Sequence, residues 1–436
     1  MSDDLGLTEA VSMALGGMIG GGIYAVLGVV VKVSGPLAWL AFVLAGFVAL
    51  CAGHSYVKLN ELTDAQGGSP TYIESLTHND TLAGMAGWTL LFGYIGSMAM
   101  YAYAFGSYFT DLVGIDHVVG LPVRALASVV VVAAFVGLNA VGVSETGEVE
   151  VVLVVIKVAI LVGFAALGLY YGARRGQLRS GAGSLGVGPV MAAAVSFVAF
   201  QGWQLLMYDQ STIKNAGDTI RKAIYVSIPT AVVIYIGVAV VTTSLVSIGF
   251  VSKHPETALA VAARKFSGHL GYLVISLSAL FSTASAINAT LFSSTLFSNG
   301  LISDGLLPDR LGDDSSEMPT KPVLVVGVLT AAFTLFGSLE GITSFASLTF
   351  IVVFGGMSYL AFRQRDRPEV RAVVPAVGMV GTGLFLPLMV WHLYTAERRV
   401  FYSVGVIAVL VLAVELVYFE TDIFGHQSGR ASSGKG

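Results

Sequence analysis

The sequence predicts an all-α membrane protein of about twelve transmembrane helices, built as two inverted five-helix repeats with two helices added. Of its 436 residues, 55% are hydrophobic and 11% are charged, whereas soluble domains carry about 25% charged residues. The mean hydropathy is +0.80. A surface with so few charges cannot face water throughout, so most of it must face lipid. A glycine cluster in the first apolar segment and a glycine flanked by glutamines in the sixth predict the repeats.

The number of spans follows from segment length, because a helix needs about 20 apolar residues to cross about 30 Å of hydrocarbon. Twelve segments meet this requirement. They cover residues 8–31, 35–57, 82–113, 121–142, 149–171, 190–209, 223–249, 270–298, 322–338, 342–363, 371–391 and 399–419.

We expect one transmembrane domain over residues 1–420, with the first repeat at about 8–171, the second at about 190–363 and the added helices at about 371–419. Residues 421–436 are rich in Gly and Ser and are expected to be disordered. Lys and Arg are slightly more frequent in the loops on the side of the N-terminus. This distribution favours a cell-membrane protein with both termini in the cytoplasm.

Several classes of protein are excluded. The only cysteine, Cys51, lies in the second apolar segment, so neither an intramolecular disulfide nor a cysteine-rich metal site can form. The net charge of −4 argues against a nucleic-acid partner. The chain contains no P-loop, no Gly-x-Ser-x-Gly and no metalloprotease pair of histidines. We therefore expect no enzyme, no ATP-driven pump, no metal and no cofactor.

The first and sixth segments are expected to be broken helices. Residues 16–22 read GGMIGGG, and each glycine inside a helix costs about 1 kcal/mol relative to Ala. The sixth segment is short and places Gly202 between Gln201 and Gln204. Interrupted segments at corresponding places in two halves are typical of a transporter binding site. Their spacing of five segments predicts the five-helix repeats.

These stretches resemble the amino acid–polyamine–cation transporter family. The resemblance rests on GMIGGGIY at 17–24, GG at 67–68, FVAFQGWQ at 197–204, STASAINA at 282–289 and GLLP at 305–308, in the family's order. It implies the leucine-transporter-type fold and a small organic solute, most often an amino acid. The chain departs from the family pattern at Gln204, where the family has an acid, and in the stretch after it, where a proline-rich motif is missing.

The substrate site implied by the resemblance uses backbone groups at the two breaks. The amides of Gly20, Gly21 and Gly22 are assigned to an amino acid carboxylate, at the positive end of a helix dipole. The carbonyls of Val198, Ala199 and Gln201 are assigned to the ammonium group. Tight helix packing is the alternative role for the glycines.

The pocket for the substrate side chain is assigned to Trp203, with Phe200, Tyr101 and Asn288 as further candidates. Trp203 could equally be a bulky packing residue. For Tyr101 and Asn288, packing or a bridge between helices is the more common role.

Lys157 lies in an apolar stretch, seven residues or roughly 10 Å beyond Glu150. A lysine at such depth costs at least about 2.5 kcal/mol and usually serves an ion or proton pathway, unless it snorkels to the interface. Proton-coupled relatives place a lysine amine where sodium-coupled members hold their ion, which here corresponds to the carbonyls of Gly16 and Ile19. The hydroxyls of Ser282 and Thr283 complete that site.

The sequence therefore favours a proton-coupled amino acid symporter that works by alternating access, with Lys157 in place of sodium. A sodium-coupled carrier and an obligate exchanger of the same fold stay open. A carrier of polyamines or organic cations would require acids in the pocket, where Gln204 is neutral. A channel would require charged rings or a filter motif. The identity of the amino acid and the oligomeric state are not specified.

Overall fold

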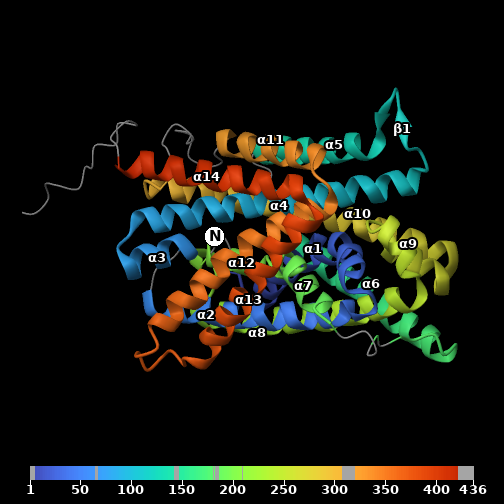
Figure 1. Ribbon diagram of the computed structural model, residues 1–436, viewed down its shortest axis with the longest axis horizontal. Coiled ribbons are helices and arrows are strands. Elements are labelled where there is room, and N and C mark those ends of the chain that lie inside the picture. The colour runs from blue at the N-terminus through green and yellow to red at the C-terminus, as the bar shows by residue number, and fades with distance from the viewer. Residues whose placement is uncertain are drawn as a thin grey trace, which may run out of the picture.

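The structure is a computed structural model, and it confirms the predicted all-α class (Figure 1). It describes residues 5–63, 67–141, 147–179, 181, 186–208, 210–306 and 320–420. The predicted disordered tail therefore lies outside the described residues. The first half contains α1 (Leu7–Ser34), η1 (Gly35–Leu37), α2 (Ala38–Thr63), α3 (Ser69–Thr77), α4 (Asp80–Val113), the hairpin of β1 (His117–Val118) and β2 (Leu121–Pro122), α5 (Val123–Ala140) and α6 (Gly147–Arg174).

The second half begins with a series of short helices where one span was predicted. It contains α7 (Gly188–Val195), η3 (Phe197–Phe200), η4 (Trp203–Met207), η5 (Gln210–Thr212), α8 (Ala216–Leu245), α9 (Ile248–Lys253), α10 (Ala258–Ser303), α11 (Thr320–Phe336), α12 (Leu339–Arg363), α13 (Val373–Ala396) and α14 (Arg398–Glu420). Within the described residues, each predicted segment falls on helical structure. The boundaries of the two repeats stay a prediction.

Eight helical stretches in the described part of the chain are long and apolar enough to cross a membrane. The first of them, Leu7–Thr63, holds both α1 and α2. The helix α10 is longer than predicted because it joins two helices across Gly268, whose φ of 64° interrupts the helical geometry. In Figure 1, α5 and α11 lie along one side of the bundle and α2 and α8 along the opposite side, with α1 between them.

The predicted break in the sixth segment is confirmed. The chain passes from η3 to η4 through Gln201, which is extended, and Gly202, whose φ of 127° favours glycine. This irregular backbone is fully buried. Non-helical backbone at membrane depth is tolerated only where protein or a cavity surrounds it.

The predicted break in the first segment is wrong, because α1 runs through residues 16–22 without interruption. Its glycines allow neighbouring segments to pack directly against the backbone of α1. A Cβ on Gly21 would lie 2.0 Å from Cδ1 of Tyr101, and a Cβ on Gly17 would lie 2.7 Å from the Cα of Gly202. Tertiary packing on this face thus compensates for the low helix propensity of glycine.

Candidate functional site

The break in the sixth segment lies directly against the glycine face of α1. Gly17 meets the backbone of Gly202, and a Cβ on Gly22 would lie 3.2 Å from both the Cα and the carbonyl oxygen of Ala199. Glycine permits this approach because any side chain would separate the two backbones. The two segments that the sequence singled out are therefore in contact at the centre of the molecule.

A buried network of three side chains holds the break in place. The side-chain amide Nε2 of Gln201 donates to the Tyr101 hydroxyl at 2.6 Å, and Nε2 of Gln204 donates to Oε1 of Gln201 at 3.2 Å. Oε1 of Gln204 accepts from the backbone N–H of Gly202 at 2.7 Å. Gln204 thus uses both its donor and its acceptor, which an ionised carboxylate at this position could not do. Gln204, which stands where the family has an acid, therefore has a structural role in the site.

Tyr235 of α8 is a site residue that the sequence analysis missed. Its hydroxyl lies 2.7 Å from the carbonyl oxygen of Met18 and 3.1 Å from that of Ala199, so it bridges α1 and η3. Its ring packs against Phe200 with the centroids 5.4 Å apart. A tyrosine in an apolar helix carries no signal that separates this role from ordinary packing.

The predicted backbone ligands are mostly engaged within the protein in this conformation. The amides of Gly20, Gly21 and Gly22 lie inside the continuous helix α1. The carbonyl of Val198 accepts from the backbone N–H of Gln201 at 3.2 Å, and that of Ala199 faces Tyr235. The structure brings these groups close together, but most of them already have hydrogen-bond partners within the protein.

The predicted side-chain pocket is filled by packing. Trp203 is fully buried. Its ring packs edge-on against Tyr56, with the centroids 5.1 Å apart, and at a tilt against Phe354, with the centroids 5.0 Å apart. Its indole Nε1 has no hydrogen-bond partner in the described part of the chain. Asn288 accepts from Nδ2 of Asn139 at 2.8 Å and so bridges α5 and α10, the alternative role considered for it.

The predicted coupling residues lie on three helices that are in mutual contact. Lys157 is only 3% exposed on α6, which packs against α1, α8 and α10. A Cβ on Gly20 of α1 would lie 3.5 Å from the Ser282 carbonyl, so α1 and α10 meet at this level. The Thr283 hydroxyl donates to the Ala279 carbonyl at 2.7 Å, whereas the buried Ser282 hydroxyl has no hydrogen-bond partner among the described residues.

The remaining two coupling residues, Gly16 and Ile19, are buried within α1. Their carbonyls belong to the hydrogen-bond ladder of a continuous helix, because the expected break is not there. A free carbonyl pair at this place therefore requires α1 to open locally.

The site is closed by neutral side chains on the side where α1 begins. The hydroxyls of Tyr94 and Tyr208 lie 3.0 Å apart, and the Tyr208 ring packs against Phe297 at 4.8 Å between centroids. A Cβ on Gly68 would lie 2.6 Å from the Tyr208 ring, so the predicted glycine loop packs directly on this closure. A cavity of about 250 Å³ lies outside it, lined in part by Pro70.

The opposite side is closed by charged side chains. Lys32, near the end of α1, forms an ion pair with Glu340 of α12. The second carboxylate oxygen of Glu340 lies 3.3 Å from Nε2 of His392 on α13. Burial and the negative charge of Glu340 raise the pKa of Glu397, which follows α13, above its ordinary value. Three helices are therefore joined at this end of the site.

Known proteins resemble this chain over almost all of its length. Residues 5–415 match the amino acid permease family. An uncharacterised protein of Methanocaldococcus jannaschii is 30% identical over 419 residues, or 95% of each chain. The inner membrane transport protein YbaT of Escherichia coli is 28% identical over 90% of each chain. The methylthioribose transporter of Bacillus subtilis is 24% identical over 93% of this chain and 90% of its own.

Among solved structures, the manganese transporter of Eremococcus coleocola superposes with a TM-score of 0.61. The alignment covers 94% of this chain and 92% of that one at 13% identity, so it shows the fold, which is of the leucine-transporter type. The chain belongs to the amino acid permease family and is a multi-pass membrane transporter.

Proposed function

We propose that the protein is a secondary active transporter of amino acids, driven by the proton gradient, with Lys157 as the coupling group. The observation that carries the proposal is the burial of this lysine, 3% exposed on a helix that packs against α1, α8 and α10. A lysine inside the membrane is costly, and such residues usually lie on ion or proton pathways. No other described residue combines this depth with a cationic side chain.

The coupling follows from the charge of the amine. Protonated Lys157 attracts the carbonyls of Gly16 and Ile19 on α1 and the hydroxyls of Ser282 and Thr283 on α10. Loss of the proton removes that attraction and shifts the population toward the other access state.

Binding of the substrate requires a local opening of α1. The run GGMIGGG contains five glycines in seven residues, and each lowers helix stability by about 1 kcal/mol relative to Ala. Opening there frees the amides of residues 20–22 for an amino acid carboxylate. The ammonium group meets the carbonyls of Ala199 and Gln201. We expect the side where α1 begins to be cytoplasmic.

A sodium-coupled carrier or an obligate exchanger of the same fold is the second candidate. One observation favours sodium: Ser282, a hydroxyl assigned to the ion in sodium-coupled relatives, is buried and unpartnered among the described residues. Lys157 argues against it, because an amine and a cation repel each other at one site. The methylthioribose transporter among the relatives shows that solutes other than amino acids must be included in a screen.

The test is uptake by purified protein in liposomes under an inward proton gradient, an inward sodium gradient, or neither. We expect proton-driven accumulation of one or more amino acids by the wild type. Lys157→Ala is expected to abolish accumulation. Ile156→Ala is the matched control, because Ile156 is the adjacent residue of α6 and its side chain is 49% exposed.

The outcomes separate the candidates. Proton-driven accumulation that survives Lys157→Ala would refute the coupling role. Dependence on sodium, or uptake only with substrate preloaded inside, would replace the mechanism but keep the substrate class. Counterflow of methylthioribose without any amino acid would replace the substrate class.

A further inference from the structure

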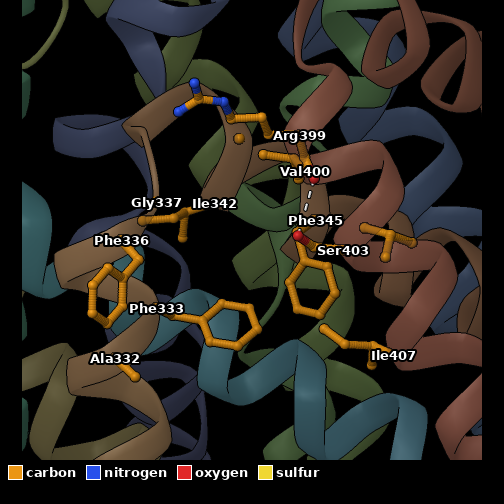
Figure 2. Close-up of a pocket in the computed structure, with 12 residues that line it drawn as sticks. Ala332, Phe333, Phe336, Gly337, Ile342, Phe345, Arg399, Val400, Ser403 and Ile407 are labelled. Atoms are coloured by element: carbon orange, nitrogen blue, oxygen red, sulfur yellow. Dashed lines mark hydrogen bonds between the residues drawn. The ribbon is translucent and has the colours of Figure 1, made fainter.

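An apolar groove lies between α11, α12 and α14, away from the transport site. Its volume is about 320 Å³. Its lining is apolar except for Arg399 and Ser403. Figure 2 shows Arg399 at one end, and the rings of Phe333, Phe336 and Phe345 with Ile407 toward the other. The groove therefore has one cationic end and an apolar body.

A second cavity extends this groove along α14. Its volume is about 240 Å³, and it lies between α4, α12 and α14. It shares Phe345, Val404 and Ile407 with the first cavity and reaches Leu412. From Arg399 to Leu412 the helix rises roughly 20 Å, at about 1.5 Å per residue. One leaflet of hydrocarbon is about 15 Å deep, so the two cavities together can hold an acyl chain.

The cationic end of the groove lies where the helices reach the membrane boundary. Arg399 is the second residue of α14, and the groove is bordered there by Gly341 in the first turn of α12. Among the described residues, no carboxylate forms an ion pair with the exposed Arg399 guanidinium. Arg398 adds a second positive charge beside it, and the Glu397 carboxyl lies at the same end, 3.6 Å from a Cβ on Gly341, so the two arginines leave this end net positive. A guanidinium at headgroup level pairs with phosphate through its planar fork.

We propose that this groove binds a phospholipid with an anionic headgroup, whose phosphate pairs with Arg399 and whose acyl chain lies along α14 toward Leu412. The charge at one end and the apolar lining over the rest match the two parts of such a lipid. The adjacent Arg398 favours a net anionic headgroup over a zwitterionic one. The site rests on the membrane location of the chain and is independent of its substrate.

The proposal is tested on the full chain in detergent by native mass spectrometry, with titration of phosphatidylglycerol or phosphatidylcholine. We expect tighter binding of phosphatidylglycerol, weakened roughly tenfold by Arg399→Gln, the loss of one charged contact. Arg174→Gln is the matched control, because Arg174 is an exposed arginine at the end of α6 and does not line the groove. Equal affinity of the wild type and Arg399→Gln for phosphatidylglycerol would overturn the proposal.

The apolar part of the site is tested without a change of charge. Ile407→Trp fills the section that both cavities share and is expected to weaken binding, whereas Val409→Trp, at a position 65% exposed outside the groove, is not. If both variants bind as the wild type does, the groove does not hold the chain. Efficient disulfide-linked dimers of Ser403→Cys in liposomes would show that a second copy covers the groove, which also overturns the proposal.

Discussion

Oε1 of Gln204 accepts a hydrogen bond of 2.7 Å from the backbone N–H of Gly202, two residues before it. The break in the sixth segment is thereby closed by a neutral side chain that belongs to the broken segment itself. Its amide also donates to Gln201, which in turn donates to Tyr101 on α4. One glutamine thus joins the irregular backbone to a neighbouring helix.

We expect Gln204→Leu to lower the free energy of unfolding by about 1–3 kcal/mol, because it leaves the buried Gly202 N–H without an acceptor. The measurement is the melting temperature in detergent. Gln177→Leu, at an exposed glutamine after α6, serves as the control and is expected to change little. An unchanged melting temperature for Gln204→Leu would show that the network does not support the break.

Gly21→Ala is expected to destabilise the protein by about 1–3 kcal/mol through overpacking, because its Cβ would lie 2.0 Å from the Tyr101 ring. Gly163→Ala in α6 is the matched substitution, since no atom lies within 4 Å of its added Cβ. It is expected to stabilise the helix by up to about 1 kcal/mol. Melting temperatures that shift in opposite directions would confirm packing as the role of Gly21; the same direction would contradict it.

Tyr235→Phe keeps the ring but removes the hydroxyl that bridges Met18 and Ala199. We expect a loss of about 0.5–1.5 kcal/mol in stability. We also expect slower uptake, because the bridge joins α1 to the broken segment. Tyr170→Phe, at a tyrosine that is 60% exposed on α6, is the control. Equal uptake by Tyr235→Phe and the control would remove Tyr235 from the site.

The Glu397 carboxyl is expected to make the stability of the fold depend on pH. Its pKa is raised by burial and by Glu340, so the folded state holds the proton more tightly than the unfolded chain does. The free energy of unfolding therefore falls as the pH rises from the ordinary Glu pKa of about 4.3 through the raised value. We expect Glu397→Gln to increase the melting temperature at pH 7.5 more than at pH 4.

The control for that experiment is Glu369→Gln, at an exposed carboxyl after α12. Equal shifts of Glu397→Gln at both pH values would show that the Glu397 carboxyl does not destabilise the fold near neutral pH.

The sequence predicted the helical segments and the break at Gly202, because apolar length and a glycine between glutamines are local signals. The predicted break in α1 was wrong, because helix propensity includes the cost of each glycine but not the stabilising contacts with side chains that pack where glycine has none. Those side chains, such as Tyr101 for Gly21, are distant in sequence. The bridge from Tyr235 to Met18 spans 217 positions, and no local pattern encodes it.

The two closures of the transport site differ in their response to dissolved ions. The Lys32–Glu340 pair joins α1 to α12 through full charges, and the Lys32 side chain is 46% exposed, so mobile ions with a Debye length of about 8–10 Å screen it. The Tyr94–Tyr208 contact carries no net charge and is insensitive to such screening. Concentrated salt on the face of the membrane that bears Lys32 is therefore expected to weaken the contact between α1 and α12 and to leave the contact between the two tyrosines unchanged.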